Sequence, residues 1–173
     1  MWVILTCLLS LAVWWDFKTH RIPNKLILLG MCLGSIFSIL PNGVGWLNAL
    51  LGWSVGLVVF MPFYLLRVLG AGDVKLLATV GAFVGYPAVL LVALFSCLAG
   101  GFLSILIALQ QRQLMQMSRN LYQGLMVFCL QITSGGKTSQ WSMVTTQRRL
   151  PYALAIALGT LYYAFMHGNF LSQ

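Results

Sequence analysis

The chain has 173 residues, of which 60% are hydrophobic and only 7% charged, and its formal net charge is +8. A mean hydropathy of +0.91 with repeated apolar runs is typical of a membrane protein that crosses the bilayer several times, and it excludes an ordinary soluble domain. The length suits a single integral-membrane domain over residues 1–173.

The first apolar run, Met1–Trp15, could be mistaken for a signal peptide. It lacks a basic start and ends in two tryptophans, rather than in the small residues of a cleavage site. We therefore predict a retained transmembrane helix that ends at Asp16.

Five further apolar runs predict transmembrane helices, because glycine- and proline-containing turns separate them. The runs are Leu26–Leu40, Trp46–Leu66, Val74–Tyr86, Ala88–Leu109 and Leu150–Met166. Helices satisfy their own backbone polar groups in lipid, as no open sheet can. The predicted fold is therefore all-α, a polytopic membrane protein of about six transmembrane helices.

All ten lysines and arginines lie on one side of this arrangement, because they fall in the first, third and fifth loops. The positive-inside rule makes that side cytoplasmic and places both termini outside. Basic residues in short loops between apolar runs do not indicate nucleic-acid binding, so no nucleic-acid partner is expected.

The longest connection, residues 110–149, is predicted to remain on the cytoplasmic side. Its most apolar part, Leu121–Ile132, is too short to span a bilayer. Apolar residues recur at helical spacing from Leu114 to Ile132, which predicts an amphipathic helix on the membrane surface, followed by a polar linker over Thr133–Gln147. A substrate platform and a simple connector both fit this pattern.

The chain contains only two acidic side chains, Asp16 and Asp73. Asp16 follows the first apolar run and Asp73 precedes the fourth, so the predicted topology puts both at the cytoplasmic face. Val74–Tyr86 would extend about 20 Å as a helix, less than a bilayer core of about 30 Å. Both aspartates are therefore expected slightly below the membrane surface.

Two carboxylates that lie close together are the essential catalytic groups of an aspartic protease. Their repulsion keeps one protonated, so the ionised one can take a proton from an attacking water while the other donates to the peptide carbonyl. Each also has a simpler explanation, which is a helix N-cap for Asp73 and an interfacial salt bridge for Asp16. The catalytic pair is favoured because the chain has no other acid and both fall on one face.

Other protease chemistries lack their residues in this chain. Without glutamate there is no HExxH zinc motif, and no GxSG-type serine motif occurs. The four cysteines stand singly, so no zinc site is predicted, and no cofactor is expected.

Three short segments stand out from the apolar runs. Residues 70–75 read Gly-Ala-Gly-Asp-Val-Lys, Asp16 is followed by Arg-Ile-Pro-Asn at residues 21–24, and residues 150–153 read Leu-Pro-Tyr-Ala. Together they resemble the type IV prepilin peptidases, a family of GxGD aspartic proteases, and the third segment is similar to the proline-containing start of that family's last helix. The resemblance extends over nearly the whole chain.

The resemblance implies an aspartic endopeptidase that removes the short basic leader of type IV prepilins or pseudopilins at the cytoplasmic face of the bacterial inner membrane. Asp16 and Asp73 would be its catalytic pair. The longer bifunctional members carry a cytoplasmic insertion with paired CxxC motifs, which this sequence lacks, so no methyltransferase activity is expected. The compact form resembles the small peptidases of Tad/Flp-type pili.

Six further residues would support the site by the same resemblance: Gly70, Gly72, Lys75, Arg21, Pro23 and Asn24. The two glycines would let the backbone approach the substrate closely. The proline and asparagine would shape a turn. The two cations would lie near the pair and favour its ionised form, although membrane anchoring also explains them.

Substrate recruitment cannot rest on charge alone, because the cytoplasmic face and the leader are both basic. Two small-residue pairs, Gly30 with Gly34 and Gly52 with Gly56, could dock a substrate helix or simply pack within the bundle. Two other functions also stay open: a small proton-coupled transporter, since intramembrane acids mark ion paths, and a non-catalytic membrane assembly factor for pili or secretion.

Overall fold

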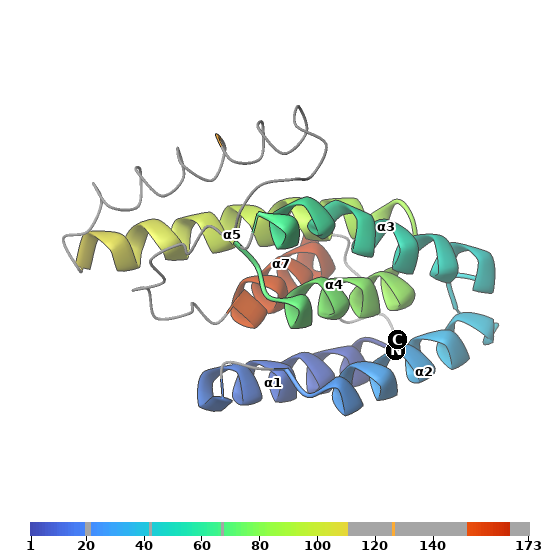
Figure 1. The fold of residues 1–173 in the computed structure, drawn as a ribbon. Helices are drawn as coiled ribbons and strands as arrows, with labels where there is room; N and C mark the ends of the chain where they lie inside the picture. The colour runs from blue at the N-terminus through green and yellow to red at the C-terminus, as the bar shows by residue number, and fades with distance from the viewer. Residues whose placement is uncertain (20–21, 42, 67, 111–125, 127–151, 167–173) are drawn as a thin grey trace, which may run out of the picture. The chain divides into compact units, whose positions relative to one another are not determined.

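The computed structural model describes residues 1–19, 22–41, 43–66, 68–110, 126 and 152–166 (Figure 1). The chain divides into two compact units, one of Met1–Gly101 with Pro151–Gln173 and the other of Phe102–Leu150. The predicted amphipathic helix and polar linker within residues 110–149 lie almost entirely outside the described residues, so they remain predictions.

The described part of the chain is helical. Its helices are α1 (Trp2–Thr19), α2 (Asn24–Ile39), α3 (Trp46–Leu65), α4 (Ala71–Val84), α5 (Ala88–Gln110) and α7 (Tyr152–Met166) (Figure 1). Each corresponds to one predicted apolar run, so the predicted all-α fold is confirmed. Several boundaries differ from the predicted runs, and two of them affect the aspartates. Helix α1 continues to Thr19, so Asp16 lies inside its last turn rather than at its end, and α4 begins at Ala71, so Asp73 lies inside its first turn rather than before it.

Three helices are long and apolar enough to cross a membrane, namely α1, α3 and the Ala88–Leu106 part of α5, and α2 and α7 are shorter apolar helices. Many large apolar side chains face outward, among them Val58 at 68% and Phe165 at 79% exposure. Apolar surface on this scale would promote aggregation in water, whereas in a bilayer it contacts lipid. The protein is therefore an integral membrane protein with several membrane-crossing helices.

Helix α4 is the centre of the first unit. Val74 and every residue from Leu76 to Val84 are buried, and the helix contacts α2, α3 and α7. A helix that is apolar on all sides is stable only when other helices surround it. The neighbouring helices therefore bury α4, which has 14 residues and is too short to be counted as a membrane span by itself.

Close backbone contact joins α3 to α4 at glycines. A Cβ atom on Gly52 would overlap the carbonyl oxygen of Gly81, and one on Gly56 would lie 2.9 Å from the Cα of Ala78. Small residues allow this approach, which is a common way to pack helices in membranes.

The other predicted glycine pair lies on α2 and is also used inside the bundle. A Cβ on Gly30 would lie 2.7 Å from Cγ2 of Thr79, and one on Gly34 would lie 3.1 Å from Cβ of Ala82. Both pairs of glycines are buried. They pack the bundle, so the hypothesis that they form an exposed docking face for a substrate helix is wrong.

Candidate active site

Asp16 is buried, with 6% of its surface exposed, and its carboxylate contacts the beginning of another helix. Its Oδ2 accepts a hydrogen bond from the backbone N–H of Ala153, at 3.2 Å, and Ala153 is the second residue of α7. The first N–H groups of a helix have no partner within the helix, and the helix dipole favours negative charge there. Asp16 therefore caps α7 from α1.

Asp73 lies in the first turn of α4 and is partly buried. Its Oδ2 accepts a hydrogen bond from the backbone N–H of Gly70, the N-cap residue, at 3.1 Å. This is the side-chain-to-backbone half of a capping box. The N-cap is Gly70, so Asp73 is not the N-cap residue that the simpler explanation makes it, but occupies the N3 position. Its carboxylate is held at the N-terminal end of the α4 dipole.

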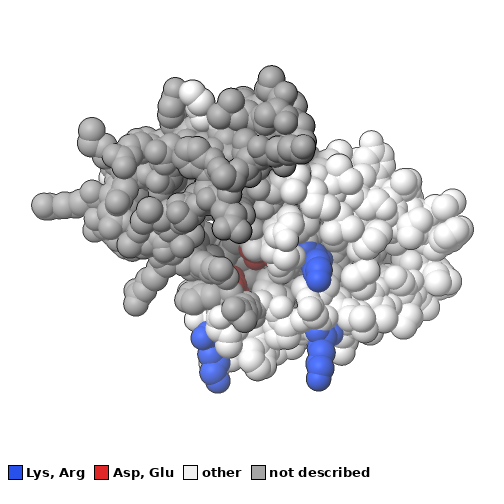
Figure 2. All heavy atoms as spheres, in the orientation of Figure 1, with Lys and Arg blue, Asp and Glu red and all other residues white. Residues whose placement is uncertain are grey.

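The two carboxylates are neighbours. Asp16 of α1 lies close enough to Asp73 of α4 for the two carboxyl groups to influence each other electrostatically. Figure 2 shows the red atoms of the chain's only two acidic side chains close together, with little of either visible on this face. The structure therefore brings together the two residues that the sequence singles out, and each is held by a backbone N–H at the start of a helix.

The two glycines before Asp73 have different surroundings. A Cβ atom on Gly70 would lie 3.2 Å from Oδ2 of Asp73, so glycine leaves room beside the carboxylate. A Cβ on Gly72 would lie 3.2 Å from the Cβ of Ile22. Gly72 therefore accommodates a residue of the Arg-Ile-Pro-Asn segment, a contact that the sequence does not predict.

A polar contact joins the same two segments. Nζ of Lys75 donates a hydrogen bond to Oδ1 of Asn24 at 3.3 Å, and both side chains are exposed. Pro23 precedes α2 in an extended conformation, and its carbonyl accepts the N–H of Leu26 at 3.0 Å. The predicted supporting residue Arg21 lies outside the described residues.

The start of α7 is a part of the site that could not be assigned from the sequence. The Leu-Pro-Tyr-Ala segment carried a resemblance but no predicted role. The N–H of Ala153 holds Asp16, and the charge of Asp73 acts on the hydroxyl of Tyr152. A backbone donor leaves no signature in a sequence, so only the motif itself could have pointed to this turn.

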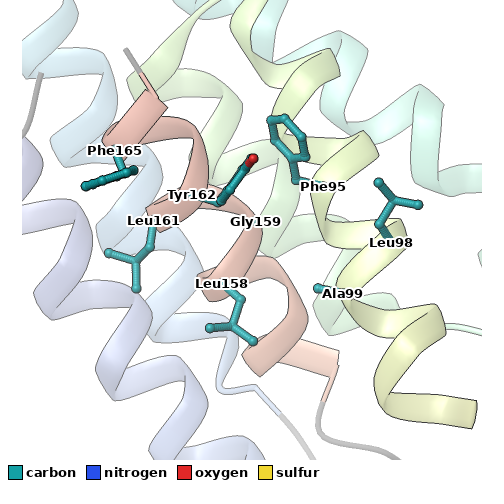
Figure 3. Close-up of a pocket in the computed structure, with 8 residues that line it drawn as sticks. All are labelled: Phe95, Leu98, Ala99, Leu158, Gly159, Leu161, Tyr162 and Phe165. Atoms are coloured by element: carbon teal, nitrogen blue, oxygen red, sulfur yellow. The ribbon is translucent and has the colours of Figure 1, made fainter. Parts of the chain in front are cut away.

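A groove of about 600 Å³ lies elsewhere, between α5 and α7 (Figure 3). Its walls are apolar and aromatic, including Phe95 and Leu98 of α5 and Leu158 and Phe165 of α7. It contains neither aspartate, so we do not assign chemistry to it. Among the described residues, no three His, Cys, Asp or Glu side chains come together as metal ligands.

Comparison with known proteins places both aspartates in a matched region. Residues 3–105 match the type IV leader peptidase family. The prepilin leader peptidase/N-methyltransferase of Aeromonas hydrophila is 32% identical over 110 residues, which cover 60% of this chain and 38% of that protein. The proteins so described from Aeromonas salmonicida strain A449 and from Aeromonas salmonicida give the same identity and coverage.

The chain therefore spans well under half the length of the curated relatives it matches. No solved structure matches it. The family match includes Asp16, Asp73 and the Arg-Ile-Pro-Asn segment, and it extends over more than half of the chain. The chain belongs to the type IV leader peptidase family.

Proposed function

We propose that this protein is a membrane aspartic endopeptidase that removes the short basic leader of Flp-like type IV prepilins. The proposal rests on one observation: the only two acidic side chains, Asp16 and Asp73, lie close together in a chain of this family. The names of the relatives, prepilin leader peptidases, support the same class of substrate. The substrate partners are prepilins or pseudopilins, within the lipid bilayer.

The chemistry uses the pair as one unit. Two carboxylates this close share one proton, because mutual repulsion disfavours a second negative charge. The ionised carboxylate takes a proton from a water molecule, whose oxygen attacks the carbonyl carbon of the leader's last residue. The protonated carboxyl gives its proton to the carbonyl oxygen. The C–N bond of the tetrahedral intermediate then breaks as the carboxyl that took the water's proton gives it to the leaving amine. The other carboxylate takes a proton back from a hydroxyl of the intermediate, so the pair again holds one proton.

The surroundings suit a site that carries one negative charge. The amide of Ala153 stabilises the carboxylate of Asp16, and the amide of Gly70 stabilises that of Asp73. Hydrogen bonds from N–H groups to the charged form favour ionisation, whereas burial opposes it. The two influences together favour the singly ionised pair that the mechanism requires.

Location and orientation are part of the proposal. The predicted placement of all ten basic residues on one side supports a site at the cytoplasmic face of the bacterial inner membrane, with both termini outside. The sequence lacks paired CxxC motifs, which supports a peptidase without methyltransferase activity. Two acids at one face do not form a path across the membrane, which argues against the transporter alternative.

The test is cleavage of a co-expressed Flp-type prepilin, followed by a gel shift and by sequencing of the new N-terminus. We expect the wild type to cleave after the leader glycine, and we expect Asp16→Asn and Asp73→Asn to fail at normal membrane abundance. Normal cleavage by either variant would refute the dyad. If the wild type does not cleave, and pilus assembly still requires the protein, the assembly-factor alternative replaces the peptidase.

A further inference from the structure

The first turn of α7 contacts Asp16 and lies within electrostatic reach of Asp73. The backbone N–H of Ala153 donates to Oδ2 of Asp16. The neighbouring residue, Tyr152, has its hydroxyl within electrostatic reach of Asp73. A movement of this turn would therefore change the position of Asp16 relative to Asp73.

The side chain of Tyr152 fixes this turn against two other helices. Its ring occupies the space beside Gly100 of α5, where a Cβ atom would lie 2.8 Å from Cζ and 2.9 Å from the hydroxyl oxygen of the tyrosine. Its ring also meets Phe60 of α3 edge-on, with ring centroids 6.0 Å apart and an angle of 69° between the planes. Aromatic rings prefer this edge-to-face geometry.

The hydroxyl group contributes less than the ring. It donates to the backbone carbonyl of Ser96 at 3.5 Å, the upper limit for a hydrogen bond, and it also has a hydrogen-bonding contact with the thiol of Cys97. Hydrogen bonds weaken at such lengths, so packing is the main constraint on the side chain.

We infer that Tyr152 is a positioning residue for the catalytic pair, which fixes the first turn of α7 and through the Ala153 amide holds Asp16 opposite Asp73. The inference rests on the proposed peptidase function. Tyr152 takes no part in proton transfer in this proposal. Its effect comes from geometry, since misplacement of a catalytic group by about 1 Å can lower a rate by about 100-fold.

Two adjacent glycines of α5 provide a matched test. Gly100→Ala places a methyl group against the Tyr152 ring, whereas no atom of the described residues lies within 4 Å of a Cβ at Gly101. We expect Gly100→Ala to lower kcat for prepilin cleavage by about 10- to 100-fold with KM unchanged. Gly101→Ala is expected to cleave like the wild type. Equal kinetics for the two variants would refute the inference.

Substitutions of the tyrosine separate packing from the hydroxyl group. Tyr152→Phe keeps the ring and is expected to retain most of kcat, whereas Tyr152→Ala is expected to lose about as much as Gly100→Ala, again without a change in KM. A rise in KM with kcat preserved would instead indicate substrate contact and refute a positioning role.

A double variant guards against a simple folding defect. In the Tyr152→Ala background the ring is absent, so Gly100→Ala has nothing to displace and is expected to cause no further loss. If Gly100→Ala lowers kcat by the same factor in both backgrounds, it acts independently of Tyr152 and the inference is wrong. The wild type and Gly101→Ala are measured alongside. If neither of them cleaves, the proposed function itself is wrong and the positioning role falls with it.

Discussion

Replacing Asp73 with asparagine or with alanine separates the two roles of its carboxylate. Oδ2 of Asp73 accepts the N–H of Gly70 and so caps α4, and the same group is proposed to transfer a proton. Asparagine keeps an acceptor oxygen that can retain the cap, but it carries no charge and no exchangeable carboxyl proton. Alanine removes both the cap and the acid.

The two effects differ greatly in size. Loss of an N-terminal helix cap costs about 1 kcal/mol, which lowers the ratio of folded to unfolded protein by about five-fold. For a protein of this length the same loss lowers the Tm by about 2–4 °C. Loss of a general acid or base lowers the rate by about 10²- to 10⁴-fold. Unfolding through the lost cap therefore cannot account for the loss of cleavage.

The assay measures the rate of prepilin cleavage per amount of folded enzyme, together with the Tm of each purified variant in detergent. We expect both variants to lose at least about 100-fold in rate, and we expect only Asp73→Ala to melt at lower temperature. Cleavage by Asp73→Asn above about a tenth of the wild-type rate would show that the carboxylate is a cap and no more. A Tm reduced equally in both variants would contradict the capping role.

Three further outcomes follow from the contacts of the described residues. Gly52→Ala should lower the Tm, because its methyl group overlaps the Gly81 carbonyl and overpacking costs about 1–3 kcal/mol, whereas Gly101→Ala should leave the Tm unchanged. Lys75→Met removes the hydrogen bond to Asn24, and because both side chains are exposed the Tm should hardly change. A cleavage rate as low as that of the aspartate variants would instead indicate that the lysine takes part in catalysis. Treatment with EDTA should leave cleavage unchanged, because the carboxyl groups supply both acid and base; inactivation reversed by a divalent metal would contradict this.

The helices could be predicted from the sequence because a helix that crosses a membrane requires a long run of apolar residues. Each apolar run became one helix, and the alternation of basic and neutral loops predicted that Asp16 and Asp73 share one face. Two loops lie on the same side of the membrane when an even number of helices crosses it between them. Such a prediction requires no knowledge of how the helices pack.

The contacts inside the site could not be predicted in the same way, because they depend on the register between helices. Nothing in the sequence states that Gly72 lies against Ile22 or that Lys75 reaches Asn24. The glycine spacing of α3 was correctly identified as a helix-packing surface, but the same spacing serves a substrate helix or a neighbouring helix equally well. The burial of Gly52 against α4 decides between them.

The geometry of the pair has a common physical basis that links the fold to the chemistry. A charged carboxylate is costly in or near the bilayer, and helix N-termini are among the few fixed sources of positive potential available there. Asp16 lies at the N-terminus of α7 and Asp73 at that of α4. The α4 terminus is contacted by the segment before α2, through Ile22, and the α7 terminus is fixed by Tyr152 against α3 and α5.

The described residues of the three short motifs all lie at a helix start or pack against one. The starts of α7 and α4 hold the two acids. A change that tilts α7 should therefore act mainly on Asp16, whereas a change at Gly72 should act mainly on Asp73. Parallel cleavage measurements on Gly100→Ala and Gly72→Ala would compare these two routes. Because both variants displace a member of one pair that works as a unit, the double variant should lose less activation free energy than the sum of the two single losses. Fully additive losses would contradict a shared site.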